Sequence, residues 1–135
     1  MNKPPTVVDL VWNGELTFRV ATRQSFLTLD GDGAAGPSPV DALAAALAGC
    51  MSTDIVDILV KGRHPLRALR SRLTADRAPD NPHRFLRAAL HFTIDGSVPA
   101  DAVARAIALS RDKYCSVWHS LRQDIEFSTS YELRA

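Results

Sequence analysis

Two cysteines are the residues of this chain with the most distinctive chemistry. Cys50 lies inside a long apolar segment, GPSPVDALAAALAGCMSTDIVDILVKGR, and Cys115 lies in the segment ALSRDKYCSV. In a reducing compartment a lasting structural disulfide is rare, so such thiols are inert core residues, metal ligands or a redox pair. If the fold brings them together, one could attack an oxidant and the other could resolve the product as a disulfide.

The histidines do not add a metal site to these cysteines. His64, His83, His91 and His119 are scattered along the chain, and no C-x-x-C or H-x-x-x-H pair brings ligands together. Two thiols are few for a zinc site. We therefore expect no bound metal.

An inert role is the first alternative for Cys50, because buried free cysteines are commonly structural. Cys50 lies too far inside the predicted helix for the N-terminal dipole to favour its thiolate. Asp54, one turn later on the same face, opposes a thiolate. A reactive Cys50 therefore needs a cation from elsewhere. Arg19 and Arg23, in the predicted N-terminal strands, are the candidates, and a solvated strand arginine is the alternative reading of each.

The segment around Cys50 has clear helix signals. Ser38 is a good N-cap, Pro39 suits the first helical position, and Asp41 stands three residues after the cap as in a capping box. The helix is predicted to run to about Lys61. Asp41 precedes Cys50 by nine residues and therefore points to the opposite side of the helix.

The first half of this helix is apolar all round, so it must be covered on all sides. A chain of this size with a single sheet cannot do that alone. We therefore expect a homodimer with this helix near the interface.

The remaining elements are indicated by alternation and turn residues. The expected strands cover residues 6–12, 16–22, 25–29, 69–77, 85–94 and 125–133, and a second helix covers 99–114. The order βββ-α-ββ-α-β predicts one α+β domain over residues 1–135. We expect its long central helix to pack against an antiparallel sheet.

Composition limits the classes of partner and compartment. The chain has 135 residues, 46% apolar and 23% charged, with a net charge of +1. No basic block favours nucleic acid or a membrane surface. The N-terminus has no signal-peptide pattern, and Asp54 and Asp57 interrupt the longest apolar stretch before it could span a bilayer. A cytoplasmic location is expected.

The Cys50 helix, the later ALSRDKYCSV segment and the final STSYEL strand together resemble the OsmC/Ohr family, and its YhfA-like branch most closely. The resemblance covers nearly the whole chain. It implies a tightly intertwined homodimer in which antiparallel sheets wrap two long central helices and two active sites lie at the subunit interface. Characterised members are thiol peroxidases that favour organic hydroperoxides over hydrogen peroxide.

The resemblance also implies roles for the two cysteines. The Cys50 thiolate would attack the terminal peroxide oxygen, giving a sulfenic acid and an alcohol. Cys115 would then condense with that sulfenic acid to a disulfide, which a small lipoyl-like dithiol would reduce. No bound metal or organic cofactor is needed.

The chain departs from the family pattern in the activating pair. The family peroxidases carry a glutamate ten residues before the reactive cysteine, and Val40 stands there; Asp41 is one place off and shorter. The family arginine corresponds to Arg19 or Arg23. The missing glutamate favours an alternative function: a dimeric binding protein that holds a small apolar ligand in the interface pocket. A redox stress-response protein, whose disulfide changes a partner contact, is a third reading.

Overall fold

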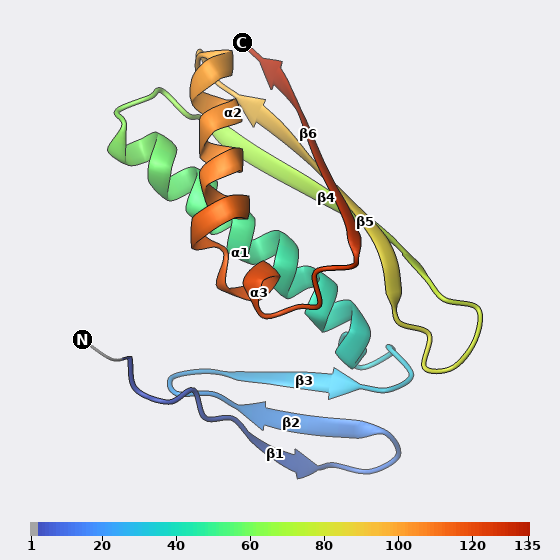
Figure 1. Cartoon of the computed structure of the whole chain (residues 1–135). Coiled ribbons are helices and arrows are strands. Elements are labelled where there is room, and N and C mark those ends of the chain that lie inside the picture. The colour runs from blue at the N-terminus through green and yellow to red at the C-terminus, as the bar shows by residue number, and fades with distance from the viewer. Residues whose placement is uncertain (1–2) are drawn as a thin grey trace. The chain divides into compact units, whose positions relative to one another are not determined.

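The computed structural model describes residues 3–135 and divides into two units (Figure 1). The N-terminal unit ends at Leu43, and the C-terminal unit spans Ala44–Ala135. The elements follow the order βββ-α-ββ-α-β, with the second helical region divided into three consecutive segments. The α+β fold predicted from the sequence is confirmed, while the assignment of residues 1–135 to one domain stays a prediction.

The N-terminal unit contains a three-stranded antiparallel meander, formed by the three strands predicted over residues 6–12, 16–22 and 25–29. Its strands are β1 (Asp9–Trp12), β2 (Thr17–Ala21) and β3 (Phe26–Asp30), paired in that order. Gly14, at φ 98°, and Glu15, at φ 49°, carry the chain round the first turn. Glycine adopts this left-handed conformation without steric cost, and the pair Asn13-Gly14 is a typical turn sequence between two strands.

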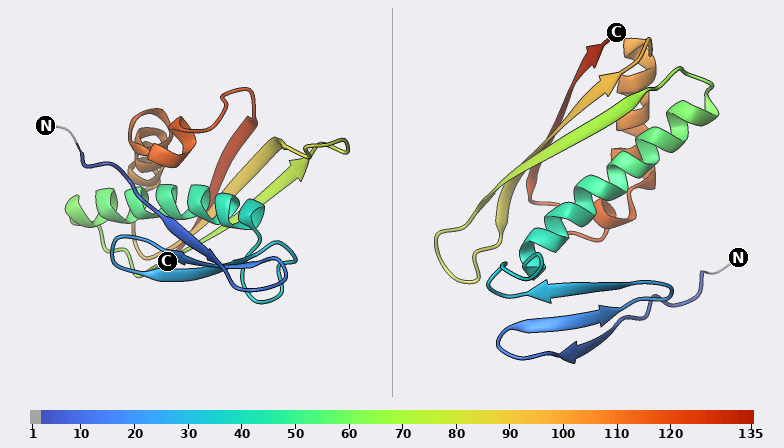
Figure 2. Two further views of the ribbon diagram at one scale, coloured as in Figure 1. Left: turned by 90° about the horizontal axis from the view of Figure 1, so that it is seen from below. Right: turned by 180° about the vertical axis from the view of Figure 1, so that it is seen from behind.

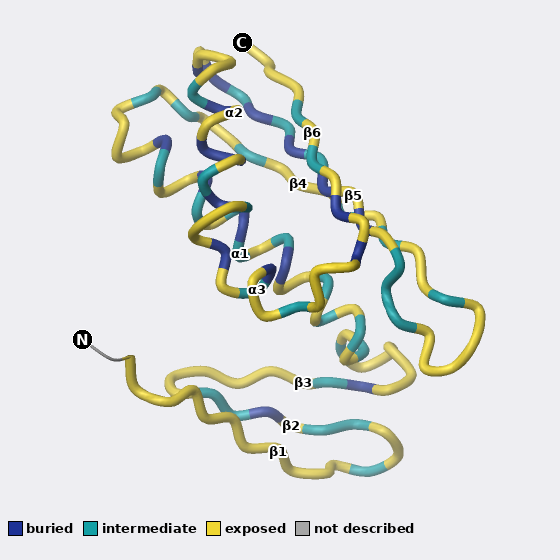
Figure 3. Tube along the Cα trace, in the orientation of Figure 1, coloured by how far each residue is buried: buried dark blue, intermediate teal, exposed yellow. Residues whose placement is uncertain are grey.

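This sheet buries little of its own surface, and most of its trace is coloured as exposed (Figure 3). Asp30 at the end of β3 is an exception. Its carboxylate accepts hydrogen bonds from the backbone N–H groups of Asp32, Ala34 and Ala35 at 2.9, 3.2 and 2.9 Å. These bonds, that from Ala35 above all, hold the pKa of Asp30 below its usual range. They close the loop that leads into the first helix.

The first helix, α1 (Pro39–Lys61), has the bounds predicted from its caps. The Ser38 hydroxyl accepts the Asp41 backbone N–H at 3.1 Å, as an N-cap does. Asp57 and Lys61 form an exposed ion pair at 2.9 Å in the last turn. One stripe of α1 is buried in the core of the C-terminal unit, and it consists of Leu47, Met51, Ile55 and Leu59.

The opposite side of α1 is also apolar but open. Val56 and Val60 are 37% and 56% exposed. By length and composition alone α1 is apolar enough to cross a membrane. Its buried stripe nevertheless packs into the core, which is the behaviour of a core helix.

The C-terminal unit is built on the sheet β4 (Ala68–Arg77), β5 (Phe85–Asp95) and β6 (Glu126–Arg134), in that order. β4 and β5 are antiparallel, as expected, but β5 and β6 are parallel. The expectation of a wholly antiparallel sheet is therefore wrong for β6. The reason is the long helical crossover between β5 and β6, which returns the chain to the same end of the sheet before β6 begins.

That crossover contains α2 (Ala100–Leu109), the π-helical segment η1 (Ser110–Tyr114) and α3 (Ser116–His119). The predicted helix over residues 99–114 is thus confirmed in extent, but its last turn is wound as a π-helix. Short π-helical segments are rare and occur frequently at functional sites. Cys115 follows this segment directly.

The helices α1 and α2 lie on one side of the C-terminal sheet (Figure 2). Strict alternation over residues 85–94 predicts that Leu86, Ala88, Leu90, Phe92 and Ile94 point inward, and the structure buries the last four and half-buries Leu86. Val103 and Ile107, which the helical spacing over residues 99–114 places on one apolar stripe, pack into the same core. The core therefore lies between this sheet and the helices α1 and α2. Cys50 lies in α1, and Cys115 follows α2 after the π-helical segment.

Candidate functional site

The two cysteines meet in the C-terminal unit, although they lie on different helical elements. Cys50 is in the middle of α1, half-buried, and packs against the core. Cys115 lies between η1 and α3 and is 0% exposed. Both are free thiols. We call these two side chains the thiol pair.

The environment of Cys115 keeps its thiol protonated. Burial raises the pKa of Cys115 to about 11, against the weaker effect of the Trp118 backbone N–H, which lowers it. The neighbouring Cys50 side chain, which lies within hydrogen-bonding reach, raises the pKa of Cys115 further. At neutral pH Cys115 is therefore a neutral thiol in contact with its partner, which makes it a weak nucleophile in the resting protein.

The backbone around Cys115 is fixed by several hydrogen bonds. Its N–H donates to the carbonyl of Ser110 at 2.7 Å, which closes the π-helical turn. Its sulfur accepts the Trp118 N–H at 3.3 Å and so caps α3, and its carbonyl accepts the His119 N–H at 3.1 Å. The thiol thus stands where one helical segment ends and the next begins.

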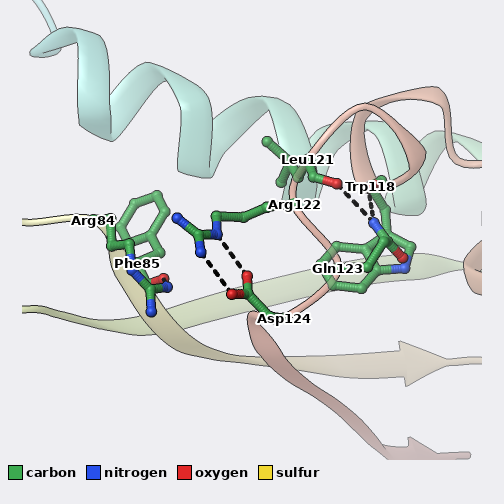
Figure 4. Close-up of polar contacts among 7 residues, drawn as sticks. All are labelled: Arg84, Phe85, Trp118, Leu121, Arg122, Gln123 and Asp124. Atoms are coloured by element: carbon green, nitrogen blue, oxygen red, sulfur yellow. Dashed lines mark hydrogen bonds and ion pairs between the residues drawn. The ribbon is translucent and has the colours of Figure 1, made fainter.

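Trp118, whose N–H binds the Cys115 sulfur, packs against β6. Its ring lies against Phe127, with centroids 4.6 Å apart and planes inclined by 40°. Figure 4 shows how the following turn is held: the Gln123 amide donates to the carbonyls of Trp118 and Leu121 at 3.0 and 2.8 Å. The exposed Arg122 and Asp124 form a two-bond ion pair in the same turn. Through the Trp118 carbonyl, the Gln123 amide holds the residue whose N–H binds the Cys115 sulfur.

A polar contact links the two helical elements beside the thiol pair. The hydroxyl of Ser110, which is 0% exposed, donates to the carboxylate of Asp54 at 2.8 Å. Sequence reasoning placed Asp54 on the Cys50 face of α1 without a partner and did not single out Ser110. The signal was present: Ser110 stands three residues after Ile107 and seven after Val103, which puts it on the buried stripe of α2.

The thiol pair is suited to two-cysteine redox chemistry, in which a sulfenic acid forms first and a disulfide follows. A thiolate at Cys50 can take an oxygen atom to become a sulfenic acid, and a neighbouring thiol can convert that acid to a disulfide. Among residues 3–135, no group of three or more His, Cys, Asp or Glu side chains is placed to hold a metal ion.

Comparison with known proteins assigns this architecture. The sequence model of the family described as OsmC-like protein matches residues 30–130, which include the thiol pair and the Asp54–Ser110 contact. The chain belongs to the OsmC-like family. The resemblance seen in the sequence, including its YhfA-like character, is confirmed.

Individual relatives agree with the family assignment. Protein YhfA of Escherichia coli K12 is 37% identical over 127 residues, covering 92% of this chain and 95% of YhfA. A protein of Aquifex aeolicus VF5 has the same fold, with a TM-score of 0.91, 24% identity and coverage of 98% of each chain. An organic hydroperoxide resistance protein OsmC of Legionella pneumophila has a TM-score of 0.71 at 18% identity, covering 98% of this chain and 99% of its own.

The remaining predicted site residues of this OsmC-like protein lie in its N-terminal unit. Arg19 is exposed on β2, with its guanidinium 4.4 Å from the centre of the Phe26 ring. Arg23 is exposed in the turn between β2 and β3. Asp41 is exposed in the first turn of α1, where its backbone N–H is bound to Ser38. The roles of these three residues, like those of the two cysteines, stay predictions.

Proposed function

We propose that this OsmC-like protein is a cysteine-based peroxidase that reduces organic hydroperoxides to alcohols. The observation that carries the proposal is the thiol pair: a half-buried Cys50 beside a fully buried Cys115, both free. Solved neighbours of the same fold named as organic hydroperoxide resistance proteins support it. The difference in burial also supports the division of roles, because a peroxide from solvent reaches Cys50 more easily than Cys115.

In the first step the Cys50 thiolate attacks the terminal oxygen of the hydroperoxide. The O–O bond breaks, the sulfur becomes a sulfenic acid, and the alkoxide takes up a proton to leave as the alcohol. The thiolate needs a nearby cation, since Asp54 stands one turn away on the same face. We assign this cation to Arg19 or Arg23, as the family resemblance implies.

In the second step Cys115 attacks the sulfur of the Cys50 sulfenic acid. A sulfur–sulfur bond forms, the sulfur–oxygen bond breaks, and the hydroxyl group leaves with the Cys115 proton as water. A small lipoyl-like dithiol then reduces the disulfide by thiol–disulfide exchange and is itself oxidised. The cycle needs a supply of reduced dithiol, and we therefore place the protein in the cytoplasm.

We further propose that the working form is a homodimer. The open apolar side of α1 at Val56 and Val60 supports this, because such a face is normally covered. The intertwined dimer implied by the sequence resemblance would also complete the surroundings of Cys50.

A thiol count after one equivalent of hydroperoxide tests the peroxidase function. Fully reduced wild type is mixed with cumene hydroperoxide, and free thiols are titrated within seconds. We expect loss of both thiols in the wild type as the disulfide forms. Cys115→Ser should lose its single thiol to the sulfenic acid, while Cys50→Ser, the matched control, should keep its Cys115 thiol.

Survival of both wild-type thiols for minutes would contradict the peroxidase function. So would equally fast thiol loss in Cys50→Ser. Survival would instead favour a dimeric binding protein for a small apolar ligand, for which the shallow groove along Val56 and Val60 is the relevant observation. In that case apolar ligands should raise the melting temperature without any thiol oxidation.

A further inference from the structure

Ser110 is a buried polar residue in a position that an apolar residue could fill. It is 0% exposed, and it follows the buried residues Val103 and Ile107 at helical spacing on the crossover. A buried hydroxyl is costly unless it is hydrogen-bonded, and here its bond goes to a carboxylate on another helix, at 2.8 Å. Replacing such a contact by well-packed apolar residues is often neutral or stabilising. Its presence therefore calls for a reason other than stability.

Ser110 makes two hydrogen bonds, one from its side chain and one through its backbone, and together they link the two cysteines. Its side chain binds Asp54, which lies one turn after Cys50 on the same face of α1. Its backbone carbonyl accepts the N–H of Cys115 at 2.7 Å. One residue thus connects the backbone of the second cysteine to the helix turn that carries the first. The connection spans η1, whose π-helical turn is closed by this same backbone bond.

We propose that Asp54 and Ser110 are positioning residues that hold the Cys115 sulfur against the Cys50 sulfur for disulfide formation. The inference rests on the proposed function and assigns these two residues to its second step only. In that step the Cys115 sulfur forms a bond to the Cys50 sulfur as the sulfenic hydroxyl leaves as water. Alignment of the reacting atoms can supply a large part of such a rate, and small misplacements cost up to about a hundredfold.

This role differs from proton transfer by Asp54. Positioning needs an acceptor oxygen at residue 54, and it does not need a charge. Asp54→Asn keeps an oxygen that can accept the Ser110 hydroxyl, whereas Asp54→Ala removes it. Ser110→Ala removes the donor with almost no change of volume. Asp57→Ala is the matched control, because Asp57 lies on the same helix but pairs with the exposed Lys61.

The test follows both steps in a single turnover with one equivalent of cumene hydroperoxide. Sulfenic acid at Cys50 and the disulfide are quantified over time by quenching and mass spectrometry. We expect Ser110→Ala and Asp54→Ala to slow disulfide formation tenfold or more, with Cys50 oxidation within twofold of wild type. Asp54→Asn should stay within about threefold of the wild-type rate in both steps. The control Asp57→Ala should react at the wild-type rate in both steps.

Two results would overturn the proposal. One is disulfide formation at the wild-type rate in both Ser110→Ala and Asp54→Ala. The other is disulfide formation as slow in Asp54→Asn as in Asp54→Ala. That result would mean that the step needs the negative charge of Asp54 and not only an acceptor oxygen.

An equilibrium measurement separates this proposal from the peroxidase function. The reduction potential of the Cys50–Cys115 disulfide, formed with diamide, is measured in dithiothreitol redox buffers, so no hydroperoxide is involved. A tenfold loss of effective concentration in Ser110→Ala should raise the potential by about 30 mV, and Asp54→Asn should leave it near wild type. A wild type that forms the disulfide with diamide but not with hydroperoxide would count against the peroxidase alone. Equal potentials in all variants would count against positioning.

Discussion

Cys50 and Cys115 are neighbours in space, but the backbone that carries them is very different. Cys50 lies in the uninterrupted helix α1, with a regular cap at Ser38 and a buried stripe on one side. Cys115 lies at a break between a π-helical segment and a short helix, and every side of its thiol is covered. The first arrangement fixes a thiol while leaving it accessible to solvent. The second removes a thiol from solvent and keeps it protonated.

This difference supports the order of events in the proposed two-cysteine cycle. A thiol that must meet an external oxidant needs access, and Cys50 has it. A thiol that must react only with its neighbour gains from burial, because a raised pKa protects it from oxidants and alkylating agents. The two environments therefore match the attacking and resolving roles better than the reverse assignment.

The largest expected effect is on the reactivity of Cys115. Since burial and its raised pKa suppress the thiolate, iodoacetamide at pH 8 should modify Cys115 roughly a hundredfold more slowly than the same cysteine in the urea-unfolded chain. Peptide mapping at low conversion gives both rates, and Cys50 of the same molecule serves as the internal reference. Modification of Cys115 as fast as Cys50 would remove the contrast between the two sites.

A smaller effect is expected on stability at alkaline pH. The pKa of Cys115 is raised from 9.0 to about 11 on folding, so the unfolded chain loses its proton first. The resulting stabilisation is fully present below pH 9 and is lost as the pH rises through 11. Between pH 8 and pH 10.5 the wild type should lose about 2 kcal/mol of unfolding free energy relative to Cys115→Ala. Urea denaturation at the two pH values measures this, and an unchanged difference would show that Cys115 is solvated.

The smallest effect concerns the turn after α3, which is bonded to Trp118 and through it to Cys115. Gln123→Ala removes the amide bonds to Trp118 and Leu121, and we expect a loss of about 1 kcal/mol in unfolding free energy. Local opening should also make Cys115 about fivefold more reactive toward iodoacetamide. Arg122→Ala is the control from the same turn, because its ion pair with Asp124 is exposed and contributes little. Identical behaviour of the two variants would mean that the turn does not protect Cys115.

Much of the fold could be predicted from local patterns. α1 was predicted correctly at both ends because a serine cap, a first-turn proline and Gly62 mark it. The inward face of β5 was predicted because alternation assigns faces without knowledge of the partner strands. The direction of β6 was not predicted, since alternation is the same in parallel and antiparallel strands. The π-helical turn of η1 was missed because it is a single wider turn at the end of a helix, too short to change the apolar periodicity over residues 99–114 recognisably.

The candidate site could be predicted only in part. The two cysteines were found by residue type and by resemblance, but their contact depends on how α1 packs against the crossover, which no spacing reveals. The Asp54–Ser110 bond was missed for the same reason. Ser110 could have been noticed as a polar residue on the apolar stripe of Val103 and Ile107. The cation for Cys50 stays a prediction between Arg19 and Arg23.

Mapping the sulfenic acid to one cysteine tests the central claim most directly. Cys115→Ser and Cys50→Ser are each mixed with one equivalent of cumene hydroperoxide in the presence of dimedone, and the adduct is located by peptide mass spectrometry. We predict an adduct on Cys50 in Cys115→Ser and none on Cys115 in Cys50→Ser. An adduct on Cys115, or none on either cysteine, would contradict the assignment of Cys50 as the attacking thiol.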